Sequence, residues 1–272
     1  MGAHVVTRPP VALTVAGSDS GGGAGVVADL KTFEALGVWG TCALVAVTAQ
    51  NTLGVQSFDT ISADLVRAQI ASVGTDIGFD AVKTGMLASA ELVHAVAGAL
   101  RDAGSPPLVV DPVFVSKHGD TLLADDAVAT LRTELLPLAA VVTPNLPECS
   151  ALTGVEIDGR EDMVEAAARL EAAGVSTVMV KGGHLGGASS PDLVWVGGRA
   201  TWLEGERIAG RHTHGTGCVL SAAITAELAK GMDPVDACVA AKRFVTAAIA
   251  GGLELGAGVG PVNPGWERSA GG

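Results

Sequence analysis

The sequence is poor in aromatic and cationic side chains. It has no tyrosine among its 272 residues, and aromatic residues make up only 3% of the chain. Because hydrophobic residues still reach 48%, the core must be built mainly from alanine, valine and leucine, as in layered α/β proteins. The 17 lysines and arginines face 29 acidic residues. The resulting formal charge of −12 argues against nucleic acid as a partner, since a phosphate backbone requires a concentrated basic face.

Cysteine pairs and long apolar runs are also missing. The four cysteines lie far apart, and no C-x-x-C or zinc-like Cys/His spacing occurs, which argues against a disulfide framework or a structural metal. The N-terminal "MGAHVVTRPP" lacks a secretory pattern, and no apolar segment is long enough to span a bilayer. We therefore expect a cytoplasmic protein with reduced thiols and no membrane segment.

Short apolar runs alternate with helical patterns along the chain. The runs predict strands at 11–17, 42–51, 80–86, 108–113, 140–145 and 176–183. The intervening patterns predict helices at 25–36, 63–74, 89–101, 121–134, 160–173, 216–230 and 234–251. Strands that alternate with helices indicate an α/β fold, in which a mostly parallel sheet is covered by helices on both faces.

Two segments interrupt this alternation. Residues 52–62 alternate apolar and polar side chains and predict a small edge strand or hairpin outside the main sheet. Residues 192–207 contain two alternating runs around a Gly-Gly pair and predict an antiparallel hairpin. No low-complexity linker or internal repeat divides the chain. We therefore expect one domain over 1–272, with 1–10 and 265–272 as flexible tails.

The stretch "VAGSDSGGGAGVVADLKTF", residues 15–33, permits three interpretations. Its G-x-G-x-x-A spacing at 23–28 fits a dinucleotide loop, but an NAD-dependent dehydrogenase would carry an acidic residue where the second strand ends in Gln50. Ser18 and Ser20 resemble the setting of a nucleophilic hydrolase, but the sequence has no G-x-S-x-G elbow. The remaining interpretation is the rim of a small-molecule pocket.

The stretch "HTHGTGCVLSAAI", residues 212–224, is suited to holding an anion. Gly215, Thr216 and Gly217 precede Cys218 at the start of a predicted helix, where backbone N–H groups and the helix dipole attract negative charge. The alternative is a helix entry with a buried cysteine. The two histidines of the stretch have no third ligand nearby, so we assign no metal to them.

Polar side chains follow other predicted strands. Asn145 and Glu148 lie three apart around a helix start, which suits a hydrated Mg²⁺ or its phosphate ligands, although the same spacing is typical of a helix cap. Asp111 ends another strand. Lys181, beside two glycines, and Lys242 in the last helix are candidate phosphate contacts, with a solvated lysine as the alternative. Because ligands bind beyond the carboxyl ends of parallel strands, these strand ends predict one shared site.

Seven motifs, taken together, resemble the hydroxymethylpyrimidine/phosphomethylpyrimidine kinase family of the ribokinase-like superfamily. In chain order they are "AGSDSGGGAGVVADLKTFEALGVWG", "VTAQNT", "KTGML", "VVDPV", "TPNLPE", "VKGGH" and "HTHGTGC". The resemblance implies a three-layer ribokinase-like α/β/α fold with a small β-hairpin or edge element, and a homodimer. It also implies that MgATP phosphorylates 4-amino-5-hydroxymethyl-2-methylpyrimidine twice, first on its alcohol and then on the monophosphate, in thiamine biosynthesis.

The resemblance implies four residues for ring recognition. Gln50 and Asp29 match positions that hydrogen-bond the aminopyrimidine, while Gly17 and Met86 line its pocket. A ring with an exocyclic amine and ring nitrogens requires both an acceptor and a donor, which a carboxylate and an amide supply. Some relatives carry Glu where this chain has Gln50, which changes the hydrogen-bond polarity at that position.

The resemblance places phosphoryl transfer at the second glycine stretch. Gly215, Thr216 and Gly217 match the anion hole, and Cys218 matches the proposed base that accepts the proton of the attacking alcohol. A thiolate fits there because a helix N-terminus lowers the pKa of a cysteine. Phosphoryl transfer also proceeds by positioning and charge neutralisation, so an obligatory base is a hypothesis.

The ATP side of the site is implied in the same way. Asn145 and Glu148 match an N-x-x-E element that organises Mg²⁺ and phosphates, often through water, with Asp111 assisting. Lys181 matches a phosphate-side lysine. The metal supplies the positive charge that an acidic chain lacks. Residues 113–121 are a candidate flap, in which Lys117 would reach a phosphate.

Three other activities compete with this interpretation. A pyridoxal or pyridoxine kinase on the same fold is the nearest, since that ligand is also a small aromatic ring with a hydroxymethyl group. Gln50, Met86 and Cys218 favour the pyrimidine. An NAD-dependent dehydrogenase is the second alternative, but it leaves the GTGC at 215–218 unexplained. A vitamin-binding module without catalysis is the third.

Overall fold

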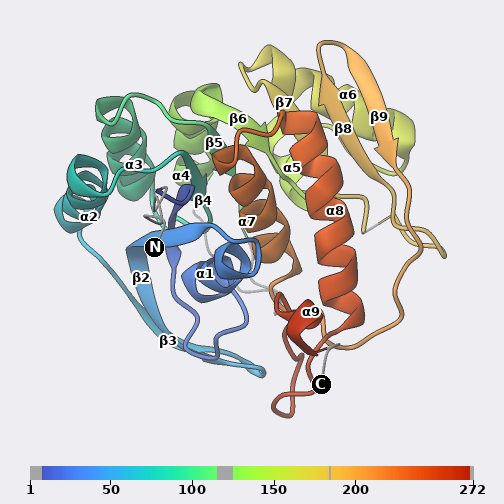
Figure 1. Cartoon of the computed structure of the whole chain (residues 1–272). Coiled ribbons are helices and arrows are strands. Elements are labelled where there is room, and N and C mark those ends of the chain that lie inside the picture. Colours follow the sequence, from blue (N-terminus) through green and yellow to red (C-terminus); the bar gives the residue numbers. More distant parts are fainter. Residues whose placement is uncertain (1–7, 115–124, 184, 270–272) are drawn as a thin grey trace, which may run out of the picture.

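The structure, a computed structural model, describes residues 8–114, 125–183 and 185–269, and the strands found there form one sheet (Figure 1). The order across the sheet is β3-β2-β1-β4-β5-β6-β7-β8-β9. The strands are β1 (Val11–Gly17), β2 (Trp39–Asn51), β3 (Gly54–Thr60), β4 (Ala81–Thr84), β5 (Leu108–Val110), β6 (Ala139–Val142), β7 (Thr177–Val180), β8 (Asp192–Val196) and β9 (Arg199–Leu203). The run from β2 to β7 is parallel, whereas β3, β8 and β9 pair antiparallel with their neighbours.

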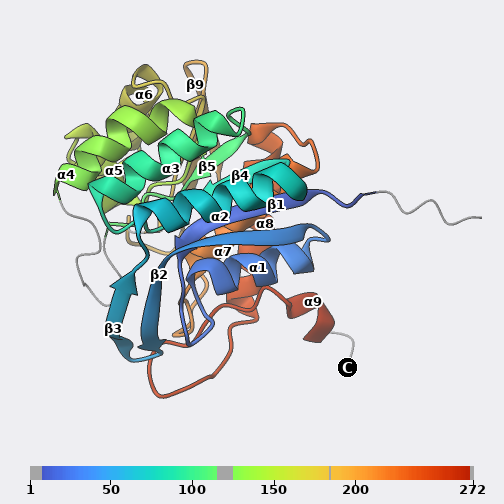
Figure 2. The ribbon, with the colours of Figure 1, turned by 90° about the vertical axis from the view of Figure 1, so that its left-hand side faces the viewer.

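Helices cover both faces of this sheet (Figure 2). One layer contains α2 (Ala63–Asp76), α3 (Ala90–Asp102), α4 (Asp125–Thr130) with its π-helical and 3₁₀ continuation (Leu131–Leu138), α5 (Leu146–Thr153) and α6 (Arg160–Ala172). The other layer contains α1 (Gly25–Ala35), α7 (Thr216–Ala229) and α8 (Pro234–Ala250). The expected three-layer α/β architecture is therefore confirmed.

Helix α7 is buried on all sides. Every residue from Val219 to Leu228 is buried, because the helix lies against the centre of the sheet and between α1 and α8. Such a helix is stable only when other elements surround it. The N-terminus of α7 is consequently fixed in the middle of the molecule.

The sheet changes direction at β1. From β1 the chain passes to β2 on one side, and after β3 and α2 it crosses to β4 on the other. The chain therefore leaves the carboxyl ends of β1 and β4 toward opposite sides, and in sheets of this kind ligands bind in the crevice outside such a pair of strand ends. The expected pocket residues Gly17 and Met86 lie at these two strand ends.

The two hairpins differ in how well the sequence predicted them. The β8–β9 hairpin is as expected, and its Gly197 and Gly198 both have positive φ, as a two-residue turn requires. The expectation that 52–62 lies outside the main sheet is wrong. Strand β2 extends beyond its pairing with β1, and β3 hydrogen-bonds this extension as the edge of the same sheet.

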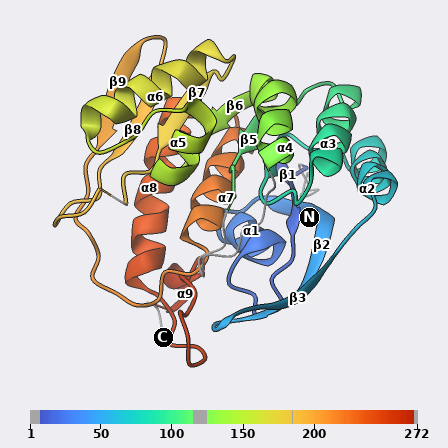
Figure 3. The ribbon, with the colours of Figure 1, turned by 180° about the vertical axis from the view of Figure 1, so that it is seen from behind.

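Both chain ends contact the body of the molecule in the parts that the structure describes. Arg8 pairs with Asp80 at 3.0 Å, so residues 8–10 are fastened to the body rather than extended as a tail. At the other end, α9 (Trp266–Ser269) packs Trp266 against the α7–α8 core. Before it, the segment 251–262 lies along the β2–β3 turn, where Val259 N–H donates to Thr52 O (Figure 3).

One lysine lies entirely inside the apolar interior. Lys83 on β4 is fully buried, and its Nζ is 2.9 Å from Oδ2 of the equally buried Asp29 on α1. Thr14 on β1 donates to the same oxygen at 2.6 Å. The nearby carboxylates raise the pKa of Lys83 well above its ordinary value although burial alone would lower it, so the ammonium keeps its charge. This ion pair ties α1 to the centre of the sheet.

Lys83→Met removes the ammonium group and keeps the length of the side chain. We expect the variant to lose about 3–5 kcal/mol of unfolding free energy, because Asp29 becomes a buried carboxylate without a counter-ion. Urea denaturation followed by circular dichroism measures the loss. The double variant Lys83→Met/Asp29→Leu should recover much of it, and the part-exposed Lys230→Met is a control that should cost less than about 1 kcal/mol. A Lys83→Met chain as stable as the parent would contradict the role of the pair.

Candidate active site

Two glycine loops that are far apart in the sequence are in contact in the structure. The first glycine loop (residues 18–24) follows β1, and the second glycine loop (residues 212–217) leads into α7. A Cβ on Gly215, whose φ is +80°, would lie 1.8 Å from the carbonyl oxygen of Gly23. A Cβ on Gly25, whose φ is +56°, would lie 2.2 Å from the carbonyl oxygen of Gly17. Only glycine allows these backbones to adopt the positive φ and to approach so closely.

The expected ring residues border the first glycine loop. A Cβ on Gly17 would lie 2.9 Å from Cε of Met86, so these two residues lie side by side as expected. Gln50 lies across the loop, where its backbone N–H donates to Ser20 Oγ at 2.7 Å, and this hydroxyl donates to the Gln50 carbonyl at 2.7 Å. Ser20 thus fastens the loop to β2 and is not a nucleophile.

Asp29 does not lie at the surface of this crevice. Its side chain is fully buried on the inward face of α1, where Oδ2 is bound by Thr14 and Lys83. The expectation that Asp29 hydrogen-bonds the ring stays a prediction, and its Oδ1 is buried without a hydrogen-bond partner among the described residues. Its partner Lys83 has a signal in the sequence, since it is a charged residue inside an apolar strand.

Asp19 and His214 connect the two glycine loops, and sequence reasoning assigned neither of them to the site. Asp19 accepts the backbone N–H of Gly21 at 2.8 Å, of Gly23 at 3.0 Å and of Ala24 at 2.9 Å. His214 Nε2 lies 2.9 Å from its Oδ2. Burial alone would raise the pKa of Asp19, but these partners outweigh it and hold the pKa below its ordinary value. An aspartate within a glycine run was the available signal.

Two helix N-termini converge on Cys218. Helix α1 begins at Gly25 and α7 at Thr216, and the Gly25 N–H is hydrogen-bonded to the Cys218 side chain. Burial raises the pKa of the Cys218 thiol to about 11, although Lys83 acts in the opposite direction. The expectation of a lowered pKa is therefore wrong, because burial of the thiol outweighs the groups that lower the pKa. Cys218 is a neutral thiol at neutral pH.

A buried cluster of charges lies on the other side of the second glycine loop. Lys181 Nζ, after β7, is 3.0 Å from Asp111 Oδ1, after β5, and 3.9 Å from Glu148 Oε2 on α5. Ser221 on α7 donates to Asp111 Oδ2 at 3.1 Å. Burial alone would raise the pKa of Asp111, but the ammonium groups of Lys181 and Lys83 hold it below its ordinary value. A Cβ on Gly217 would lie 3.4 Å from Lys181 Nζ, so the glycine loop touches this cluster.

Asn145 and Glu148 form a capping box at the start of α5. The Asn145 side chain accepts the Glu148 N–H at 2.9 Å, and the Glu148 side chain accepts the Asn145 N–H at 2.8 Å. The helix-cap alternative is thus confirmed as the local structure, and it aims Glu148 at Lys181. Burial raises the pKa of Glu148 to about 7, with Lys181 acting against the shift.

Lys242, an expected phosphate lysine, is not part of this cluster. Lys242 on α8 lies 2.7 Å from Asp192 Oδ2 and donates to the Ser190 carbonyl at 3.0 Å. Asp192 also accepts the Gly182 N–H at 2.9 Å. The Asp192 carboxylate therefore links Lys242 to Gly182, the residue that follows Lys181. Lys117 and most of the candidate flap lie outside the described residues.

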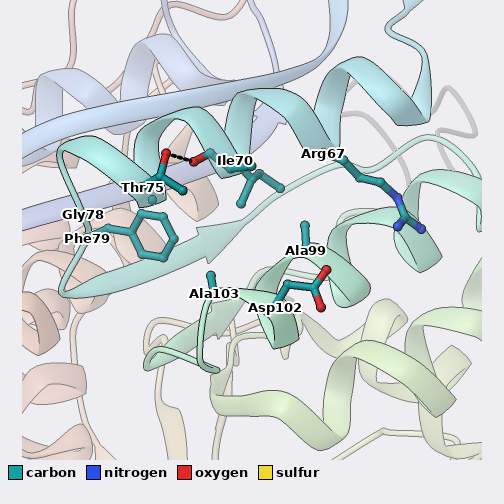
Figure 4. A pocket seen from close by; sticks show the side chains of 10 residues that line it. Arg67, Ile70, Thr75, Gly78, Phe79, Ala99, Asp102 and Ala103 are labelled. Carbon is teal, nitrogen blue, oxygen red and sulfur yellow. Dashed lines mark hydrogen bonds between the residues drawn. The ribbon is translucent and has the colours of Figure 1, made fainter.

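A separate pocket lies between α2 and α3 (Figure 4). Its volume is about 520 Å³, and Ile70 and Phe79 supply apolar surface while Arg67 and Asp102 supply the charges. Thr75 donates its hydroxyl to Ala71 O in its own helix. None of the expected site residues lines this pocket, so it is not the crevice at the strand ends.

The charged cluster suits a hydrated metal better than a cage of protein ligands. Among the described residues, no group of three or more His, Cys, Asp or Glu side chains is arranged to hold a metal ion. Two carboxylates separated by a lysine fit Mg²⁺ that keeps waters and phosphate oxygens as its other ligands. Across residues 8–114, 125–183 and 185–269, no helix is both long and apolar enough to cross a bilayer.

Comparison with known proteins gives consistent matches. A family model described as phosphomethylpyrimidine kinase matches residues 19–263. A hydroxymethylpyrimidine/phosphomethylpyrimidine kinase of Streptomyces coelicolor is 54% identical, over 95% of this chain and 95% of its own. The crystal structure of a phosphomethylpyrimidine kinase from Clostridium difficile has a TM-score of 0.78 at 39% identity, over 88% of this chain and 99% of that chain.

A structure from a neighbouring activity is also similar. The crystal structure of an ADP complex of Bacillus subtilis pyridoxal kinase has a TM-score of 0.89 at 42% identity, over 96% of this chain and 99% of that chain. The family match includes both glycine loops and the charged cluster, and it confirms the resemblance seen in the seven motifs. The chain belongs to the phosphomethylpyrimidine kinase family.

Proposed function

We propose that the chain transfers phosphoryl groups from ATP to 4-amino-5-hydroxymethyl-2-methylpyrimidine and then to its monophosphate, in thiamine biosynthesis. The observation that carries the proposal is the position of the second glycine loop. It touches the first glycine loop through Gly215 and the Asp111–Lys181 pair through Gly217. A phosphoryl group at the N-terminus of α7 therefore lies between a ring-binding crevice and a phosphate-binding cluster.

The ring would lie in the crevice between β1 and β4. Gly17 keeps the floor open, since a side chain there would meet Met86. Met86 gives an apolar, adaptable wall. The amide of Gln50 offers a donor and an acceptor to the polar edge of the ring. Oδ2 of Asp29 pairs with Lys83, and its Oδ1, which has no hydrogen-bond partner among the described residues, would accept a hydrogen bond from the exocyclic amine of the ring.

The transferred phosphoryl group would be held by the first turn of α7. The backbone N–H groups of Gly215, Thr216 and Gly217 and the helix dipole attract an anion without a basic side chain. Cys218 lies beside them, and its neutral thiol orients the attacking hydroxyl. As an obligatory base it would first have to lose its own proton, which its raised pKa disfavours. Transfer would therefore depend mainly on positioning and charge neutralisation.

The polyphosphate of ATP would lie over the charged cluster. Lys181 would contact a phosphate, while Asn145, Glu148 and Asp111 would hold a hydrated Mg²⁺ through water. Mg²⁺ would supply the positive charge that offsets the triphosphate. The phosphate contacts expected of Lys242 and Lys117 stay predictions.

A pyridoxal kinase is the second candidate, because the Bacillus subtilis structure of that name is similar over nearly the whole chain. Gln50, Met86 and Cys218 are the reasons for preferring the pyrimidine. The homodimer and the cytoplasmic location stay predictions. The exposed apolar residues Val47, Leu53 and Phe58 along the β2–β3 edge support contact with a second copy of the chain.

The substrate preference tests the proposed activity directly. A coupled assay of ADP release should show turnover with the free pyrimidine alcohol and then with its monophosphate, and chelation of Mg²⁺ should abolish both. We expect kcat/KM for the alcohol to exceed that for pyridoxal by at least about tenfold, because the pocket is built to pair the polar edge of the pyrimidine. The reverse preference would favour the second candidate, and turnover with neither ring would contradict the proposal.

Cys218→Ser tests the role of the thiol. We expect kcat to fall by about 10–100-fold in both half-reactions with KM for ATP unchanged, because the shorter hydroxyl positions the acceptor less well. Cys42→Ser, in the half-buried part of β2, is the matched control and should keep the parent rate. Unchanged turnover of Cys218→Ser in both steps would remove the residue from the mechanism.

Glu148→Gln tests the raised pKa of Glu148 through the pH dependence of the unfolding free energy. Because the folded chain raises the pKa of Glu148 from 4.5 to about 7, it holds this proton more tightly than the unfolded chain does. The unfolding free energy of the parent chain should thus decline as the pH rises through this range. In chelator without ligands, the variant should become progressively more stable than the parent from about pH 5 to about pH 8.

The same variant should lose at least about tenfold in kcat/KM at saturating Mg²⁺, since a neutral amide holds the hydrated metal less well. Glutamine retains the oxygen that caps Asn145, so the helix start is preserved. Glu165→Gln, on the exposed face of α6, is the control and should keep the parent kcat/KM. A pH-independent difference for Glu148→Gln would show that Glu148 has no raised pKa.

A further inference from the structure

Asp19 is bound by backbone groups of the loop that contains it. Three backbone N–H groups of the first glycine loop donate to its two oxygens, at 2.8 to 3.0 Å. An ionised carboxylate has about four acceptor sites, so it can bind a fourth donor.

His214 supplies that fourth donor from the other glycine loop. Its Nε2 lies 2.9 Å from Asp19 Oδ2, across 195 residues of sequence, and the side chain is almost fully buried. Because Asp19 is ionised, Nε2 carries the hydrogen in this contact. The backbone of His214 is bound on both sides, with its N–H donating to Gly260 O at 3.1 Å and its carbonyl accepting Val262 N–H at 3.0 Å. These two hydrogen bonds fix the backbone from which the imidazole extends.

The same nitrogen faces Gln50. Nε2 of His214 and the terminal amide nitrogen of Gln50 are 3.5 Å apart. The hydrogen on Nε2 is directed at Asp19, so the imidazole offers no acceptor to an amide N–H at this position. The amide of Gln50 is better satisfied with its oxygen toward the imidazole, because two N–H groups would otherwise face each other. His214 therefore contacts the loop, the ring-recognition amide and, through the next residue, the anion-binding turn.

We propose that His214 is a positioning residue that, through Asp19, locks the ring-binding loop to the anion-binding turn and so aligns the acceptor alcohol with the phosphoryl group. The assignment rests on the proposed function, since it concerns the same site and the same reaction. His214 touches neither the reacting oxygen nor the phosphate in this arrangement. Its effect is geometric, and small misplacements of reacting groups reduce rates by about a hundredfold.

A double-mutant cycle with His214→Ala and Asp19→Asn tests the lock. We expect His214→Ala to lower kcat/KM for the pyrimidine by about a hundredfold, while the Kd for ADP, measured by calorimetry, stays within about twofold. In the Asp19→Asn background the same change should cost much less, because the contact is already weakened. His214→Gln, which places an amide N–H near Asp19, should recover part of the loss.

His212→Ala is the matched control. It removes an imidazole from the same loop, where His212 Nδ1 accepts the Gly260 N–H at 3.2 Å, and leaves the Asp19 contact intact. We expect it to keep kcat/KM within about threefold. Independent losses for Asp19→Asn and His214→Ala, or an equal loss from His212→Ala, would overturn the proposal. An equal fall in ADP affinity would also overturn it, since a general disruption of the site would then explain the result.

Amide hydrogen exchange gives a readout that requires no substrate. His214→Ala should speed exchange at residues 19–25, and His212→Ala should not, because only the first breaks the link between the loops. If the parent chain phosphorylated neither ring but this exchange difference were present, the proposed function would fail while the link would stand. If exchange were unchanged, the lock itself would be disproved, whatever the activity of the parent chain.

Discussion

Helix α7 is buried on all sides in the centre of the molecule, and the residues of the candidate site lie around its first turn. Packing against the sheet, α1 and α8 fixes the helix, so its N-terminal N–H groups are presented at one position. Gly215 then fits against the first glycine loop, and Gly217 against the Asp111–Lys181 pair. Each of these contacts depends on the helix start being immobile, because the backbones and charged groups approach too closely to tolerate displacement.

Buried charges of alternating sign surround this helix start. Lys83 and Asp29 lie beneath it, and Lys181 lies between Asp111 and Glu148 beside it. Each ammonium offsets the cost of burying its carboxylate, and together they keep the interior close to neutral. An acidic chain can therefore present a local anion site built from backbone N–H groups, with a metal ion to complete the charge balance.

In the proposed site, this separation of tasks would explain why pyrimidine and pyridoxal kinases share the scaffold. The phosphate side would depend on the helix start and the strand ends, which the fold supplies for any acceptor. The ring side would depend on a few side chains near the ends of β1 and β4, with Gln50 and Met86 foremost. The contact between Asp19 and His214 would connect the two sides, as the proposed lock requires.

The sequence by itself determined the alternation of strands and helices, the glycine turn before α7 and the capping box at Asn145, because each follows from short-range pattern or spacing. It also placed Gly17, Met86, Asp111 and Lys181 at strand ends, which the parallel sheet brings to one edge. Tertiary structure alone decided the burial of Asp29 with Lys83, the raised pKa of Cys218 and the contact of Asp19 with His214. These properties arise from solvent exclusion and from pairing across as many as 195 residues, so a local pattern can mark Lys83 or Asp19 as unusual but cannot name its partner.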